Sequence, residues 1–192
     1  MKKESMGSLF LGKWDTKTIV TVAIGAALFG VLMNCGGIPI FTNTSLTTAM
    51  IVPVVVGAMF GPLPAAVAAG VGNTIADLIG GWGMYPAWSI ANAVAALFIG
   101  ALPLYGARIT EGKLTTKQIA IYVVCVLIGN AVAFGFVAQA FTVLFEGGDM
   151  NVSLFQGLYA SIGNILVETV IGIPVMLVLA KRYASRSNLT EE

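Results

Sequence analysis

The sequence is poor in charged residues and contains no histidine. Asp, Glu, Lys and Arg make up 10% of its 192 residues, whereas they make up about a quarter of an ordinary soluble domain. The absence of histidine excludes histidine-based catalytic triads and the usual zinc-protease and haem sites. The pattern G-x-x-x-x-G-K-[ST] is missing as well, so the chain does not bind ATP through a P-loop. We therefore expect neither a catalytic site nor a metal site.

Apolar residues, by contrast, make up 57% of the chain. A membrane-spanning helix needs roughly 20 apolar residues, and charged residues bracket several apolar runs. The sequence therefore predicts an all-α integral membrane protein with six transmembrane helices. We expect these helices at residues 17–36, 46–60, 64–80, 86–107, 117–143 and 154–181. The expected organisation is a cytoplasmic N-terminal segment (1–16), a transmembrane domain (17–182) and a cytoplasmic tail (183–192).

The positions of the basic residues predict how these helices are oriented. Every Lys and Arg lies near the start of the chain, around the connection between the fourth and fifth predicted helices, or near the end of the chain. With six crossings these segments fall on one side, which the positive-inside rule makes cytoplasmic. We expect both termini in the cytoplasm of a bacterial or archaeal cell and external loops at residues 36–46, 80–86 and 144–153.

Two acidic residues, Asp77 and Glu168, fall within predicted spans. An ionisable group inside the membrane is a candidate functional group because its burial is costly. Each follows an asparagine by four residues, Asn73 and Asn164, so that amide and carboxyl share a helix face. Three interpretations remain open: hydrogen bonding between helices, recognition of a neutral, donor-rich or cationic ligand, and proton sites of a stand-alone ion-coupled carrier or channel.

The loop at 80–86 and the start of the next helix concentrate three aromatic residues, Trp82, Tyr85 and Trp88. Trp and Tyr are typical of the membrane interface, which is one explanation of the cluster. Alternatively, these rings cap a planar ligand together with the other external loops. Further polar or aromatic candidates on the same side or in the later helices are Phe41, Asn43, Thr44, Asn92, Asn130 and Gln139.

Two stretches resemble a known family. They are the loop "IPIFTNTSL" at 38–46 and the segment "AMFGPLPAAVAAGVGNTIADLIGGWGMYPAWSI" at 58–90. Both are similar to the substrate-binding S components of energy-coupling factor (ECF) transporters, and most similar to the riboflavin-type branch. In layout the resemblance covers essentially the whole chain.

The resemblance implies a six-helix protein that binds a vitamin or similar micronutrient from outside. It implies docking on a transmembrane coupling subunit that carries two ATPase subunits, so ATP is used by the partners and the chain itself has no cofactor. A small-residue pattern in the first helix contacts the coupling subunit in this family, and here Ala23 and Ala27 match it. The implied ligand-binding residues are Phe41, Asn43, Thr44, Trp88, Asn92, Asn130, Gln139 and Asn164, joined by Asp77, Trp82 and Tyr85.

The substrate class follows from the charges that the spans lack. An anionic vitamin would favour a basic partner, and no predicted span contains one in its interior. The acids and amides instead suit a neutral, donor-rich or cationic ligand. Within the riboflavin-type branch, the resemblance favours riboflavin or a cobalamin-like corrinoid.

Overall fold

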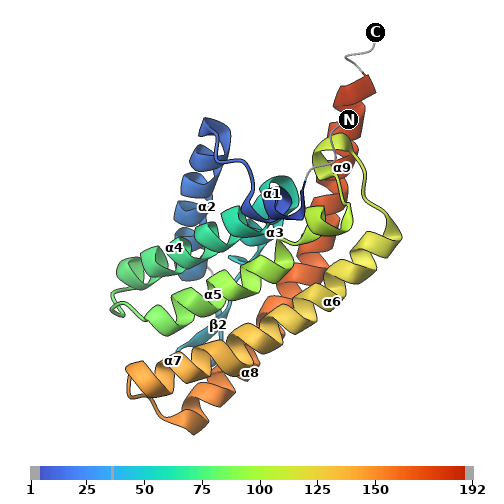
Figure 1. Cartoon of the computed structure of the whole chain (residues 1–192). Coiled ribbons are helices and arrows are strands. Elements are labelled where there is room, and N and C mark those ends of the chain that lie inside the picture. The colour runs from blue at the N-terminus through green and yellow to red at the C-terminus, as the bar shows by residue number, and fades with distance from the viewer. Residues whose placement is uncertain (1–4, 36, 189–192) are drawn as a thin grey trace.

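The protein is built almost entirely of helices (Figure 1). The computed structural model describes residues 5–35 and 37–188, with side chains as far as residue 185. The α-helices are α1 (Met6–Leu11), α2 (Thr16–Asn34), α3 (Ile51–Phe60), α4 (Pro62–Gly80), α5 (Pro86–Ile99), α6 (Thr116–Val132), α7 (Ala138–Phe145), α8 (Met150–Leu166) and α9 (Gly172–Asn188). Strands β1 (Ile38–Phe41) and β2 (Thr44–Leu46) form an antiparallel hairpin.

Four short turns interrupt or extend these helices. The 3₁₀ turns η1 (Leu102–Tyr105) and η2 (Ile109–Glu111) follow α5. The π-helical turns η3 (Ala133–Val137) and η4 (Val167–Ile171) join α6 to α7 and α8 to α9 without a break in the helix. The long rods α6–η3–α7 and α8–η4–α9 therefore each act as one element.

Within the described residues, five helices are long and apolar enough to cross a membrane. They run over Thr16–Asn34, Pro62–Gly80, Pro86–Tyr105, Thr116–Phe145 and Met150–Ser185. These five correspond to the predicted spans at 17–36, 64–80, 86–107, 117–143 and 154–181, so a multi-pass helical membrane protein is confirmed. The boundaries differ by a few residues, and Gly36 lies outside the described residues.

The predicted helix at 46–60 is wrong over its first five residues. Residues 44–46 pair with β1 instead, with Ile38 opposite Leu46, and α3 begins only at Ile51. Pro53 explains the late start. Proline is tolerated in the first turn of a helix, where the missing N–H has no intrahelical partner, but it breaks a helix interior. A helix that began at residue 46 would place Pro53 in its interior.

Other helix ends follow from local capping groups that the prediction did not use. The last helix begins at Met150, four residues earlier than predicted, because the Asp149 carboxylate accepts hydrogen bonds from the backbone N–H groups of Asn151 and Val152 at 2.9 and 3.0 Å. The predicted helix at 86–107 remains α-helical only as far as Ile99. The segment expected as 1–16 contains the short helix α1, and residues 1–4 lie outside the described part of the chain.

Small residues let the helices approach closely. α2 packs along α4, and α4 packs along α5. Gly72 of α4 lies against Phe29 of α2, so closely that a Cβ atom at position 72 would be 2.6 Å from the Phe29 Cβ. Gly57 of α3 likewise meets the backbone of Gly100 after α5. Such contacts replace the hydrophobic effect, which does not drive helices together in lipid.

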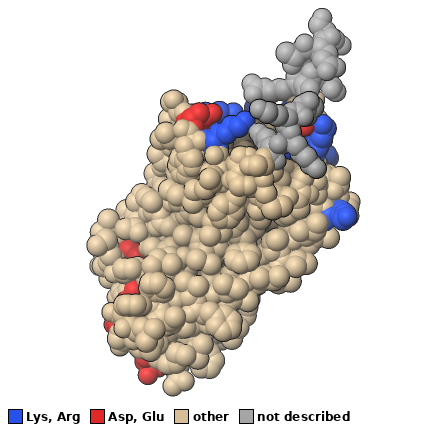
Figure 2. Space-filling model, in the orientation of Figure 1, with Lys and Arg blue, Asp and Glu red and all other residues tan. Residues whose placement is uncertain are grey.

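The charges divide the molecule into two ends. Figure 2 shows the Lys and Arg side chains of this face around the upper end, near which the end of α9 lies in Figure 1, and only acidic charges at the lower end. We call these the basic end and the acidic end. The acidic end contains the α4–α5 and α7–α8 connections, and the basic end contains the start of α2 and the η2–α6 connection.

Candidate functional site

The β1–β2 hairpin is fastened to α8 by aromatic stacking and one hydrogen bond. The ring of Phe41 stacks on that of Tyr159 with centroids 5.0 Å apart and planes 13° apart, and it also meets Phe155 at 6.2 Å. The Gln156 side-chain amide donates to the Thr42 carbonyl oxygen at 2.9 Å. The first loop of the chain is thereby closed onto the last membrane helix.

The tip of this hairpin contains the two polar residues that the sequence singled out. Asn43 is exposed and has a φ of +52°, a left-handed conformation that asparagine tolerates better than most residues. Thr44 is buried, and its hydroxyl donates to the Thr42 carbonyl oxygen at 3.2 Å. The tip is therefore held in a tight turn that leaves Asn43 exposed on the surface.

A polar network holds α4 against α5. The Asn92 side-chain amide donates to the Asn73 side-chain oxygen at 3.0 Å and to the Trp88 carbonyl oxygen at 2.9 Å. The Asn73 amide in turn donates to the Ser89 hydroxyl at 3.2 Å and to Asp77 at 3.4 Å. The two asparagines thus join the helices by the kind of interhelical hydrogen bond that buried amides make in membranes.

Two carboxylates order the loops at the acidic end. One oxygen of Asp77 accepts a hydrogen bond from the Tyr85 backbone N–H at 3.1 Å, which folds the α4–α5 loop back onto α4. Glu146, in the α7–α8 loop, accepts from the Ala87 backbone N–H at 2.9 Å and so caps the N-terminus of α5. Each carboxylate takes up a backbone donor that the helix or loop leaves unpaired.

A second polar contact joins the two long rods. The Asn130 side-chain amide donates to Glu168 Oε2 at 2.8 Å and to the Val126 carbonyl oxygen at 3.0 Å. The Tyr122 hydroxyl donates to the backbone carbonyl oxygen of Glu168 at 3.1 Å. Asn130, Tyr122 and Glu168 are all fully buried.

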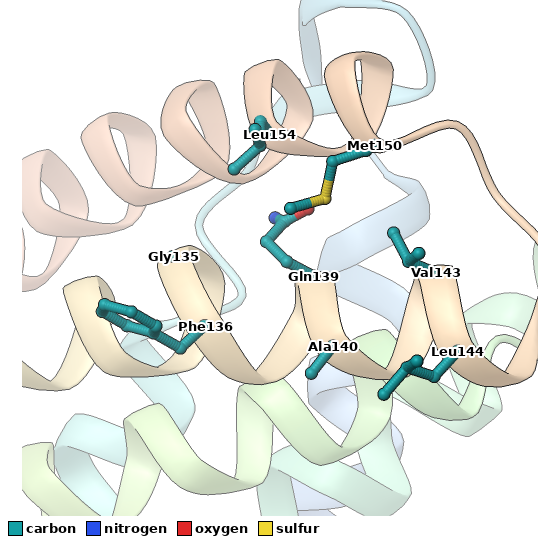
Figure 3. A pocket seen from close by; sticks show the side chains of 8 residues that line it. All are labelled: Gly135, Phe136, Gln139, Ala140, Val143, Leu144, Met150 and Leu154. Carbon is teal, nitrogen blue, oxygen red and sulfur yellow. The ribbon is translucent and has the colours of Figure 1, made fainter.

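A groove of about 510 Å³ opens between the two rods near the acidic end (Figure 3). Its lining is Gly135, Phe136, Gln139, Ala140, Val143, Leu144, Met150 and Leu154. The Gln139 amide donates to the Phe134 carbonyl oxygen in its own rod at 2.7 Å and to the Ser153 carbonyl oxygen of α8 at 3.1 Å. Its side-chain oxygen is buried with no hydrogen-bond partner among the described residues. Met150 reaches over this amide from α8 in Figure 3.

The structure brings together some of the predicted ligand-binding residues and separates others. Trp88 packs against Phe134 with ring centroids 5.8 Å apart, which places it at the contact of α5 with η3. Trp82 and Tyr85, in contrast, are 56% and 47% exposed in the α4–α5 loop. Asn164 is half-buried on α8, one turn before Glu168. No hydrogen bond of its side chain is found within the described part of the chain.

Several residues that hold the hairpin and the loops of the acidic end in place were not predicted. Tyr159, Gln156 and Glu146 were overlooked because their partners are distant in the sequence, 118, 114 and 59 residues away. One signal was available: Glu146 and Asp149 are the acids of a predicted external loop, where carboxylates often cap helix N-termini. Among residues 5–35 and 37–188, no group of three or more Cys, Asp or Glu side chains could hold a metal ion.

Comparison with known proteins finds a matching family and several relatives. A family model for the S component of ECF-type riboflavin transporters matches residues 13–181. A UPF0397 protein of Vibrio atlanticus (strain LGP32) is 33% identical over 180 residues, covering 93% of this chain and 98% of that protein. A UPF0397 protein of Aliivibrio salmonicida (strain LFI1238) is 34% identical over 179 residues, covering 92% and 97%.

Two solved structures share the fold. ThiT from Listeria monocytogenes has a TM-score of 0.56 and 21% identity, covering 86% of this chain and 96% of that one. FolT, whose crystal structure has folic acid bound, has a TM-score of 0.54 and 17% identity, covering 90% and 95%. These identities are low, so the two likenesses speak for the fold alone. On the match over residues 13–181, the chain belongs to the family of ECF-type riboflavin transporter S components.

Proposed function

We propose that this S component captures a vitamin at its acidic end, which faces outward, and presents it to a coupling subunit served by two ATPase subunits. S components are substrate-binding transport subunits rather than enzymes, and they work with the other subunits of an ECF module. ATP is used by those partners, and the chain itself needs no cofactor. The observation that carries the proposal is the hairpin closed onto α8, because α8 packs against the rod that bears the buried amides Asn130 and Gln139.

The proposed topology has six crossings, with both termini in the cytoplasm. Five crossings are the long apolar helices. The sixth combines α3, whose 10 residues span about 15 Å, with the preceding segment 44–50, because a bilayer core is about 30 Å thick. Thr47, Ala49 and Met50 in that segment are buried within the protein, where non-helical backbone is tolerated at membrane depth. The collection of Lys and Arg at one end supports a cytoplasmic assignment of that end.

The proposed ligand site lies beneath the hairpin, between it and the two rods. Phe41 and Trp88 offer aromatic surfaces, and the Asn164 amide is available for hydrogen bonding. Gln139 contributes an unpaired acceptor oxygen at the groove between the rods. Asn43 and Thr44 shape the tip of the hairpin above the site, and Asn130 lies deeper between the rods.

The α4–α5 side of the site is a supporting wall in this proposal. Asn92 is hydrogen-bonded to the Trp88 carbonyl oxygen within α5 and to Asn73 of α4, which is in turn hydrogen-bonded to Asp77, and this series of bonds fixes the position of Trp88. Trp82 and Tyr85 form an exposed rim that the outer membrane interface accommodates. Among the predicted residues, Trp88 and those of the hairpin and the rods are thus the ones that touch the ligand directly.

Riboflavin is the ligand that we favour, and a cobalamin-like corrinoid is the second candidate. The matching family is named for riboflavin. The polar groups around the site are amides and carbonyl oxygens rather than basic side chains, which suits an uncharged ring system with several hydrogen-bond donors. An anionic vitamin would instead favour a paired Arg or Lys.

The proposed docking face for the coupling subunit is the exposed side of α2, which does not pack against the other helices. Ala23 and Ala27 are both exposed there, one turn apart, and the neighbouring Ile24 and Leu28 are 62% and 47% exposed. A strip of small residues between larger apolar ones lets a partner helix approach closely in lipid.

Equilibrium dialysis of the purified chain in lipid nanodiscs tests the vitamin assignment. We expect tight binding of riboflavin or of cobalamin and none of biotin, an anionic control. Retention of no vitamin from a B-vitamin panel would contradict the proposal. Uptake by the chain alone into proteoliposomes, driven by a proton gradient, would favour an ion-coupled carrier that uses Asp77 and Glu168.

A further inference from the structure

The carboxyl group of Glu168 is buried without a cationic partner. It is fully buried in η4, where the chain contacts α3, α6, α8 and α9. The titratable side chain that faces it is Tyr122 of α6, whose hydroxyl donates to the Glu168 backbone rather than to its carboxyl. Lys117 and Lys181 on the packed helices are each 13 residues from Asn130 or Glu168, about 20 Å along the helix.

The hydrogen bonds around Glu168 leave two acceptors unpaired. Asn130 uses one amide proton for Glu168 Oε2 and the other for the Val126 carbonyl oxygen. The remaining side-chain oxygens of the pair, Asn130 Oδ1 and Glu168 Oε1, are both buried without a hydrogen-bond partner in the part of the chain that the structure describes. If Glu168 is a carboxylate, both are acceptors and neither can satisfy the other, which is costly in a buried site.

A single proton removes this conflict. A carboxylic acid and an amide form a paired arrangement in which the amide N–H donates to the acid carbonyl oxygen and the acid O–H donates to the amide oxygen. The first of these bonds is present at 2.8 Å. We propose that Glu168 holds a proton on Oε1 and donates it to Asn130 Oδ1, so that the contact between the two rods is a resident proton-binding site.

The backbone around the pair supports a specialised role. Asn130 lies three residues before η3, and Glu168 is the second residue of η4. π-helical turns account for well under 1% of residues, and they occur frequently at functional sites. Here the two turns lie on the two helices that this one hydrogen bond joins. Tyr122 completes the arrangement by pairing with the Glu168 backbone oxygen.

Infrared spectroscopy of the full chain in nanodiscs, with and without ¹³C-labelled glutamate, tests the proposal. Ordinary glutamates ionise near pH 4, so at neutral pH a protonated glutamate carbonyl band must come from an unusual site. We expect one such band, shifted by the label and by D₂O and lost in Glu168→Gln. It should persist in Glu146→Gln, a control that removes another hydrogen-bonded carboxyl group. Labelled intensity confined to the carboxylate region would overturn the proposal.

Thermal unfolding gives a second, independent measurement. Glu168→Gln presents the same donor and acceptor as the protonated acid, so its midpoint should equal that of the wild type, whereas Glu168→Leu should lower it. The wild-type midpoint should not depend on Na⁺ concentration. A Na⁺-dependent midpoint that is lost in Glu168→Gln would identify a cation site and refute the proton assignment. None of these outcomes depends on which vitamin the chain binds, so they can fail separately from the proposed function.

Discussion

Replacing Tyr159 with leucine removes the stacked ring beneath Phe41 while an apolar side chain remains. An aromatic pair contributes about 1 kcal/mol beyond its buried area. If that contact holds the hairpin over a bound vitamin, its loss should speed ligand release about fivefold, because 1.4 kcal/mol corresponds to a factor of ten. Gln156→Ala removes the hydrogen bond to the Thr42 carbonyl oxygen, which contributes about another 1 kcal/mol.

The double variant makes the prediction quantitative. If the two contacts act independently, their free-energy contributions should add, so that ligand release becomes roughly thirtyfold faster. The assay is stopped-flow fluorescence of riboflavin release from the purified chain in nanodiscs, with the association rate measured in parallel. Phe145→Leu is the matched control, since it disrupts a comparable aromatic pair with Phe141, at 5.2 Å, within α7. Release rates that do not change, or that change equally in the control, would refute the hairpin as the closing element.

Three further predictions concern the wall, the loops and the docking face. Asp77→Asn weakens the bond to the Tyr85 backbone N–H, so hydrogen exchange at Tyr85 should accelerate while riboflavin affinity stays within about twofold; a large loss of affinity would make Asp77 a direct ligand contact. Glu146→Ala uncaps α5 at Ala87 and should lower the unfolding free energy by about 1 kcal/mol, measured by thermal unfolding; an unchanged midpoint would contradict this. Ala23→Leu should abolish co-purification with the coupling subunit and leave vitamin binding intact, whereas lost binding with normal assembly would place Ala23 elsewhere.

The helices were predictable to the extent that local signals end them. Gly and Pro pairs mark the breaks near residues 61–64 and 80–86, and the structure ends helices there. Pro53 indicated that a helix starts close to residue 51. The hydrophobic pattern concealed this start, because residues 46–50 are apolar or small enough to look helical. The position of the hairpin against α8 could not be predicted in this way, since the residue of α8 that binds it is more than 100 residues away in the sequence.

For the predicted site residues, spacing within a helix identified contacts in the same helix but not contacts with other helices. Four-residue spacing correctly put Asn73 and Asp77 on one face, where they are hydrogen-bonded to each other. The same spacing linked Asn164 to Glu168, yet the amide that reaches Glu168 belongs to Asn130 on the other rod. Two π-helical turns lie beside that contact. A π turn differs from an α turn because its backbone hydrogen bonds join residues five rather than four apart. Tertiary contacts rather than local preference decide which of the two turns forms.

The hairpin pairs the facing backbone groups of its two strands within itself. The two strands hydrogen-bond to each other, and one side-chain hydrogen bond together with ring contacts joins them to α8. A segment that leaves its seat in a membrane protein normally exposes unpaired N–H and C=O groups at severe cost, but the bonds between these two strands move with the hairpin, so only their outward-facing groups and the Thr42 carbonyl oxygen need new partners. The helical frame and the closing segment can therefore diverge separately: substitutions in a few side chains of one strand can retune how long a ligand is held without disturbing any transmembrane helix.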